Sequence, residues 1–250
     1  AARVGLPIVP LSLDQRDRAV EERRWREALE ITSPALLVTD AAGGGRLRAA
    51  GLDGCPEVWL FEALEAEAQQ AAAEAEAPAL PRGWTAPPSG DTPLAYVFTG
   101  GTTRASRCVE VTHAMAVHEI RQYKDVFTPQ KGERLLQLSS AHWGAALLGE
   151  LDLALACGGA AVFSQASPSD PEGVWQAVKQ GAVTILAAVP ALLAHLPAEE
   201  AAVRTSLRLV IAWADVLPAA VARHWLAAGS VAVVELLIAS EYWLAFHARW

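Results

Sequence analysis

The sequence predicts an α/β fold of layered, mostly parallel sheets with flanking helices. Short apolar runs alternate with segments whose apolar residues recur at the helical period. Parallel strands need crossover connections, which are usually helices, so this alternation favours parallel pairing. Hydrophobic residues make up 52% of the 250 residues, which is ample for a buried core.

The first part of the chain, residues 1–77, predicts one α/β segment. Residues 5–11 have the pattern of a strand, and a helix that Ser12 or Asp14 would cap follows it. Residues 62–77 favour helix but carry almost no large apolar face, so they would form a solvated helix or a disordered connector. The further strands expected here are residues 35–40 and 58–61.

Four prolines interrupt regular structure in residues 78–91, which we interpret as a linker. Residues 92–250 then predict a second α/β segment. Its expected strands are residues 94–98, 109–112, 134–138, 160–163, 183–186, 207–212 and 231–237. Its expected helices are residues 113–126, 143–156, 172–180, 191–196 and 219–227.

Charge and cysteine content exclude several function classes. The formal net charge is −8 and no basic patch stands out, which argues against nucleic-acid binding. The longest apolar stretch, residues 182–196, contains Pro190 and His195 and is too short to span a bilayer, so we expect no transmembrane helix. Cys55, Cys108 and Cys157 lie far apart, which fits neither a zinc site nor a disulfide framework and favours a reducing intracellular compartment.

A Thr/Gly loop between two predicted strands is the strongest candidate binding feature. Thr99, Gly100, Gly101, Thr102 and Thr103 could form a nest of amides and hydroxyls for polyphosphate oxygens, with Arg107 as the cation. A plain turn is the alternative interpretation, because such loops are common between strands. The loop is not of the G-x-x-x-x-G-K-[ST] type.

The stretch LAYVFTGGTTRASRCVEVTH, residues 94–113, resembles the phosphate-binding signature of the adenylate-forming superfamily. This superfamily includes nonribosomal peptide synthetase adenylation domains, acyl-CoA synthetases and firefly-type luciferases. Further stretches resemble the family's other landmarks in the family's order, and together they cover nearly the whole chain. They are the segment at residues 1–40, LLQLSSAHWGAALLGE, VTILAAVPALLAHL, LRLVIAWADVLPAAVARHW and ELLIASE.

The resemblance implies ATP with Mg²⁺ as cofactors and a small carboxylic acid as substrate. Glu241 would hold Mg²⁺ and act with Arg107 in catalysis, while Ser240 and Asp215 would contact the nucleotide. Arg107 replaces the family's lysine, and Arg104 replaces a glycine, which would weaken phosphate binding.

The resemblance places the acid pocket at His142, Trp143, Gly144 and Trp213. Gly144 stands where an aspartate holds the α-ammonium of an amino acid, so we expect an acid other than a normal α-amino acid. His142 could equally be a structural histidine at a strand end. Trp213 replaces a glycine and would narrow the pocket.

Two functions remain open at this point. The chain is a fragment of a carboxylic-acid-activating ligase, or it is an inactive pseudoenzyme domain that contacts other subunits or domains of a larger assembly. The first residue is Ala, and the resemblance places Trp250 before the family's ribose-binding aspartate and its mobile lid with a catalytic lysine. We therefore expect this chain alone to adenylate poorly. An unrelated doubly wound α/β domain is a third possibility.

Overall fold

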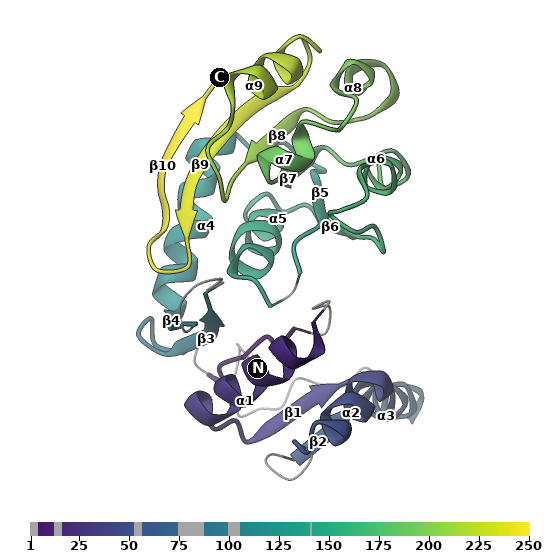
Figure 1. The fold of residues 1–250 in the computed structure, drawn as a ribbon, viewed down its shortest axis with the longest axis vertical. Coiled ribbons are helices and arrows are strands. Elements are labelled where there is room, and N and C mark those ends of the chain that lie inside the picture. The colour runs from purple at the N-terminus through teal and green to yellow at the C-terminus, as the bar shows by residue number, and fades with distance from the viewer. Residues whose placement is uncertain (1–4, 13–16, 53–56, 75–87, 100–105, 141) are drawn as a thin grey trace.

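The structure, a computed structural model, describes residues 5–12, 17–52, 57–74, 88–99, 106–140 and 142–250. It confirms the α/β class and contains a six-stranded sheet in the order β10-β9-β8-β7-β5-β6 (Figure 1). Strands β5 to β9 run parallel to their neighbours, and β10 runs antiparallel to β9. The bounds are Arg134–Gln137 (β5), Ala160–Phe163 (β6), Ile185–Ala188 (β7), Leu209–Ala212 (β8), Ala232–Ala239 (β9) and Trp243–Arg249 (β10).

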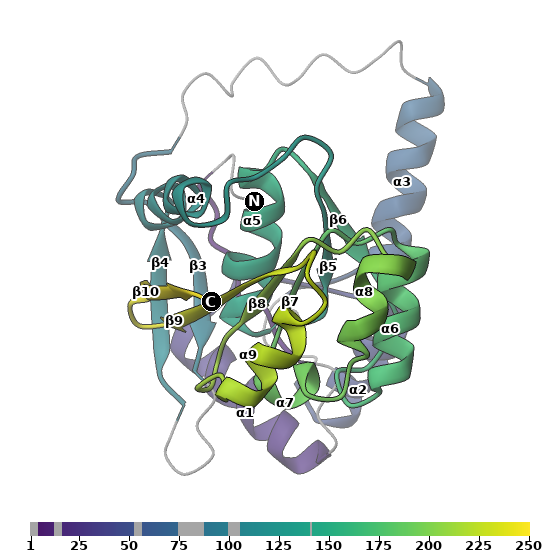
Figure 2. The same cartoon turned by 90° about the horizontal axis from the view of Figure 1, so that it is seen from above.

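Helices cover both faces of this sheet (Figure 2). Helices α6 to α9 pack on the face that carries Leu186 and Val210, while α4 and α5 pack on the face that carries Ile185 and Ile211. Successive strand residues point to opposite faces, so β7 and β8 are buried along their whole length and consist of apolar residues. The helix bounds are His113–Phe127 (α4), Asp152–Ala156 (α5), Pro171–Gln180 (α6), Pro190–Leu193 (α7), Ala198–Arg204 (α8) and Ala219–Leu226 (α9).

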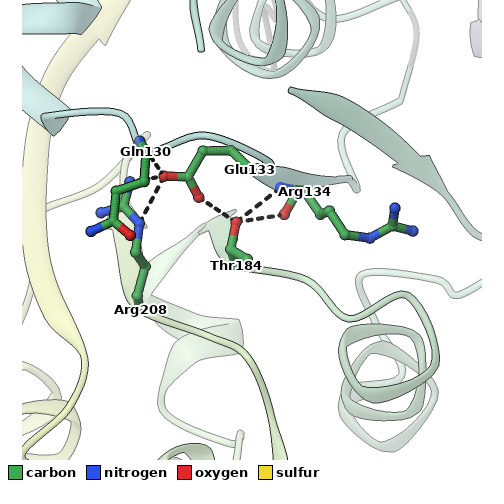
Figure 3. A network of polar contacts seen from close by, with 5 residues as sticks. All are labelled: Gln130, Glu133, Arg134, Thr184 and Arg208. Atoms are coloured by element: carbon green, nitrogen blue, oxygen red, sulfur yellow. Dashed lines mark hydrogen bonds and ion pairs between the residues drawn. The ribbon is translucent and has the colours of Figure 1, made fainter. Parts of the chain in front are cut away.

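A buried ionic network joins the amino-terminal ends of three sheet strands (Figure 3). The Glu133 carboxylate accepts hydrogen bonds from Arg208 Nε at 2.8 Å and from the Gln130 amide at 2.8 Å, and it also pairs with the Thr184 hydroxyl. Burial acts to raise the pKa of Glu133, but these donors and the Arg208 charge hold that pKa below its usual value. Glu133 therefore fastens the start of β5 to the segments that enter β7 and β8.

The first part of the chain forms a smaller layer below the large sheet (Figure 1). The predicted strands near residues 35–40 and 58–61 are confirmed as β1 and β2, which pair in parallel. The indole of Trp25 is buried and donates to the Ser12 carbonyl oxygen at 2.7 Å. The elements are Arg18–Thr32 (α1), Leu36–Thr39 (β1), Ala41–Ala49 (α2), Glu57–Leu60 (β2) and Phe61–Glu74 (α3).

The prediction of a strand at residues 5–11 is wrong. Only Ile8 makes a β-bridge, to Ala95; the Ile8 amide donates to Leu94 O at 3.0 Å and the Tyr96 amide donates to Ile8 O at 2.9 Å. Pro7 and Pro10 have no amide proton, which prevents the ladder from extending. The bridge lies against β3 (Pro93–Phe98), which forms an antiparallel hairpin with β4 (Cys108–Thr112).

The predicted cap of the first helix is also wrong. Asp17 is the N-cap, and its carboxylate accepts from the amides of Ala19 at 2.9 Å and Val20 at 3.3 Å. The Ser12 hydroxyl instead donates to Glu21 at 3.3 Å, while Asp14 lies outside the described residues.

Several elements were not predicted or differ in their bounds. Helix α2 contains three consecutive glycines, α8 is short, and β10 is mostly exposed, so none carries a strong apolar pattern. The helix expected at residues 143–156 is divided into a π-helical turn, η2 (Ala146–Leu151), and α5. Strand β7 begins at Ile185 rather than at residue 183.

The proposed division at residues 78–91 stays a prediction, since residues 75–87 lie outside the described part of the chain. Within that part, every helix falls short of the length and apolarity that a bilayer crossing requires. Cys108 and Cys157 are free thiols.

We predict that Glu133→Gln lowers the free energy of unfolding by about 2 to 4 kcal/mol, because Arg208 loses its buried counter-charge. The folded-state pKa of Glu133 is depressed, so its contribution is present above the unfolded-state value of 4.5 and is lost as pH falls through the lower folded value. Urea unfolding at pH 7 and pH 3 measures both effects. Exposed Glu30→Gln is the matched control, and equal effects of the two substitutions would contradict the prediction.

Candidate functional site

The candidate site lies where the parallel strands of the large sheet end. Because β5, β7, β8 and β9 run in one direction, the residues that follow them meet at one edge, where α/β proteins bind ligands. A cavity of about 660 Å³ opens there. Its walls come from the segments after these strands, from the end of β3 and from the turn before η2.

Six of the residues predicted from the sequence line this cavity. They come from four separate stretches of the chain, which the fold brings together. The six are Thr99, Trp143, Gly144, Trp213, Ser240 and Glu241. Gly100, Gly101, Thr102 and Thr103 lie outside the described residues.

Arg107 and Glu241 form an ion pair next to this cavity. Arg107 Nη1 lies 3.9 Å from Glu241 Oε1, with 69% of the Arg107 side chain and 40% of the Glu241 side chain exposed. The base of the Thr/Gly loop is fixed nearby, since the Thr99 amide donates to Arg107 O at 2.9 Å and the Arg107 amide donates to Thr99 Oγ1 at 3.1 Å. The structure thus brings the predicted phosphate cation beside the predicted metal ligand.

Asp215 lies in a second, adjoining cavity of about 500 Å³. The two cavities share Ala214, Ile238 and Ala239, so they flank the same pair of strand ends. Asp215 Oδ1 accepts from the Val216 amide at 2.8 Å. Leu237 lines this second cavity and is half-exposed, which offers an aliphatic surface to a ligand.

Trp213 forms part of the cavity wall and is itself almost fully buried. Its indole lies against the backbone of Gly149 in η2, where an added Cβ would come within 2.8 Å of Trp213 Cζ3. The absence of a side chain at Gly149 therefore leaves room for the indole of Trp213. Gly149 was not predicted, because nothing in a helical segment signals a contact with an indole 64 positions away in the chain.

His142 turns away from the large cavity. It borders a small cavity of about 30 Å³ beside α1, where Nδ1 lies 2.8 Å from Ser140 Oγ and the ring centroid lies 5.1 Å from that of Trp143. Its role in substrate binding stays a prediction.

Glu150 supports the wall from behind and was missed by the sequence analysis. Its buried carboxylate accepts from the Ser139 amide at 3.0 Å, the Ser139 hydroxyl at 2.9 Å and the Leu138 amide at 3.3 Å. Burial raises the pKa of Glu150 to about 7 against the lowering effect of these donors. Leu138 and Ser139 both line the large cavity, so Glu150 fixes the position of that wall.

Further buried acids lie between α4 and the segment η2–α5. Burial raises the pKa values of Glu119 and Asp152, and the pKa of Tyr123 is raised by burial and by both carboxylates. Glu119 accepts from the Leu244 amide at 3.1 Å, and the Tyr123 hydroxyl donates to Leu148 O at 2.9 Å.

Comparison with known proteins decides the family. A family model for AMP-binding enzymes matches residues 1–247. The chain belongs to the AMP-binding enzyme family. The sequence motifs predict this family, and a probable nonribosomal peptide synthetase is among the proteins that the chain resembles.

Individual relatives agree with this assignment. The AMP-binding domain is 26% identical over 192 residues to a probable non-canonical nonribosomal peptide synthetase, CymA, from Salinispora arenicola (strain CNS-205). That match covers 77% of this chain and 2% of CymA. The chain thus spans a small share of that curated relative's length.

Solved structures show the same fold. IdnL7 superposes with a TM-score of 0.74 at 20% identity, covering 99% of this chain and 49% of that one. The AMPPNP-bound form of FmoA3 (S1046A), a nonribosomal peptide synthetase, gives a TM-score of 0.65 at 23% identity, covering 90% of this chain and 23% of that one.

We predict that Glu150→Gln removes a pH-dependent loss of stability in this AMP-binding domain. The folded-state pKa is raised, so the Glu150 contribution is complete below 4.5 and is lost as pH rises through about 7. Wild-type stability should thus lose about 2 to 3 kcal/mol more than the variant between pH 4.5 and pH 8.

Urea unfolding at those two pH values measures this difference. Subtracting the variant from the wild type cancels the contributions of Glu119 and Asp152, which have the same sign. Parallel pH profiles for the two proteins would refute the assignment.

Proposed function

We propose that this domain is the nucleotide- and acid-binding part of an ATP-dependent, carboxylic-acid-activating ligase. The observation that carries the proposal is the pairing of Arg107 with Glu241 at 3.9 Å, beside a cavity at the carboxyl ends of the strands. Membership of the AMP-binding family and the likeness to an AMPPNP-bound structure support an adenine nucleotide as the ligand class.

In the proposed reaction, one carboxylate oxygen of the acid attacks the α-phosphorus of ATP. The bond from that phosphorus to the bridging oxygen breaks, and pyrophosphate leaves with the electron pair. The products are an acyl adenylate and pyrophosphate, and no proton is transferred. The protein therefore contributes by positioning the two substrates and by neutralising phosphate charge.

Arg107 is the residue proposed to neutralise phosphate charge. Its guanidinium is largely exposed, so phosphate oxygens can reach it. The planar guanidinium of an arginine can donate two hydrogen bonds to one phosphate, whereas the ammonium of the family's lysine acts as a point charge. The cavity hydroxyls of Thr99 and Ser240 would supply further donors.

Glu241 is the residue proposed to hold Mg²⁺. Its carboxylate is partly exposed, and Mg²⁺ beside phosphates is commonly held by one or two carboxylates, with waters completing its shell. The described residues contain no group of three or more potential metal-ligating side chains, which matches such a sparse site. When bound, Mg²⁺ supplies charge neutralisation at the phosphates.

A second function, an inactive adenylation-like module that contacts other subunits or domains, is favoured by two substitutions. By the resemblance, Leu237 stands where the family has an aromatic residue that stacks on adenine, and a leucine cannot stack in that way. Trp213 occupies space that small residues would leave open. In this alternative, the Arg107–Glu241 pair would be a surface ion pair with little energetic effect.

We predict that the chain binds ATP·Mg²⁺ and that Arg107→Ala weakens this binding by about tenfold or more, because one charge-assisted contact to phosphate is lost. Glu241→Gln should weaken binding in Mg²⁺ buffer but have a smaller effect in EDTA. Isothermal titration calorimetry measures all of these values, with Arg204→Ala, on α8, as the matched control.

Failure of ATP·Mg²⁺ to bind the wild-type chain would refute the proposal. Pyrophosphate exchange, measured with the same protein and a panel of carboxylic acids, then separates the two functions. Exchange would identify an active ligase domain and exclude the inactive module, whereas ATP binding without exchange is expected of both, because this chain alone is expected to adenylate poorly.

A further inference from the structure

Trp243 closes one end of the large cavity and holds an unusual backbone conformation. It is the first residue of β10, next to an irregularity in the β9–β10 register, and its φ is +54°. A bulky side chain rarely adopts this left-handed region, and such strain persists where the surrounding structure fixes it, often at ligand sites. The side chain is 8% exposed and packs with Val97, Val111 and Leu148.

This conformation places the indole of Trp243 opposite Gly144. A Cβ added at Gly144 would lie 3.2 Å from Ser240 Oγ and 3.7 Å from Trp243 Cη2. A side chain at residue 144 would therefore be tight against the Ser240 hydroxyl and in van der Waals contact with the Trp243 indole. Because residue 144 is glycine, it carries no carboxylate that could hold an amine there.

Among the described residues that line the cavity, Glu241 is the one that carries a charge, and its carboxylate already pairs with Arg107. The remaining walls are largely apolar and include three indoles, those of Trp143, Trp213 and Trp243. Moving an ammonium group from water into such surroundings without a partner costs several kcal/mol, whereas an aromatic ring gains from burial against indoles.

We propose that the acid subsite selects a carboxylic acid with a flat aromatic body and no α-amine, and that Trp243 is a specificity-determining residue for it. This inference rests on the proposed function, because it concerns the acid that reacts there. Trp243 restricts the subsite in two ways. Its indole forms an aromatic wall for the acid, and it packs beside Gly144, which has no side chain to hold an amine.

Two acids with the same carbon skeleton test this selection. 3-Phenylpropanoate and L-phenylalanine differ by the α-ammonium group alone, and acetate lacks the aromatic body. Titration calorimetry of the full chain in the presence of ATP·Mg²⁺ should give an affinity for 3-phenylpropanoate at least about tenfold higher than for either of the others.

Trp243→Ala should lower the affinity for 3-phenylpropanoate by about fivefold or more, and by a larger factor than it lowers the affinity for ATP·Mg²⁺. Trp243→Phe keeps an aromatic wall and should retain most of the affinity. It also keeps the test valid if Trp243→Ala fails to fold, as judged by circular dichroism. The matched control is Trp59→Ala, which removes an indole from the exposed face of β2.

The outcomes separate this inference from the proposed function. Absence of ATP·Mg²⁺ binding refutes the proposed function. Binding of ATP·Mg²⁺ together with equal or tighter binding of L-phenylalanine, or with no binding of 3-phenylpropanoate up to about 10 mM, overturns the inference alone. Unchanged acid affinities in both Trp243 variants would remove Trp243 from the selection.

Discussion

The parallel pairing of β5, β7, β8 and β9 is the constraint on which the rest of the structure depends. Strands β7 and β8 are buried on both faces and carry only apolar side chains, so polar groups can gather only beyond the ends of these strands. The two ends then serve different purposes. At the amino-terminal edge, Glu133 and Arg208 form a hydrogen-bonded ion pair that neutralises both charges. At the carboxyl edge, hydroxyls and an exposed ion pair surround open space.

The sequence predicts the layers of this fold well, because burial on two faces leaves uninterrupted apolar runs such as those of β7 and β8. The sequence does not predict an element whose stability comes from a single contact or from pairing with a neighbouring strand. Strand β10 is largely exposed and is held by its pairing with β9, so its composition gives little signal. Residues 5–11 show the opposite failure, since their apolar pattern is overridden by two prolines and one bridge to Ala95 survives.

The residues of the candidate site likewise include some that the sequence predicts and some that it does not. The resemblance assigned Thr99, Ser240 and Glu241 to one nucleotide site, and the structure places all three in the lining of one cavity, with Arg107 beside Glu241. The roles of Glu150, Gly149 and Trp243 follow from contacts with residues distant in sequence or from a backbone angle, neither of which composition encodes. Residue patterns thus locate the edge of the sheet where the cavity lies, while part of its wall comes from side chains that the patterns do not distinguish from ordinary core residues.

The π-helical turn η2 has a consequence for how this wall can change during evolution. Such a turn contains one residue more than an α-helical turn and commonly interrupts α-helices at functional sites. Within η2 the backbone is kinked at Leu148 (φ −117°, ψ 24°), immediately before Gly149, which lies against Trp213, and Glu150, which accepts from Ser139. Insertion or loss of a single codon in this turn would rotate those two residues out of register with the strands, while the sheet beneath could stay as it is. A ligand pocket could in this way be reshaped by a change in length rather than by substitution.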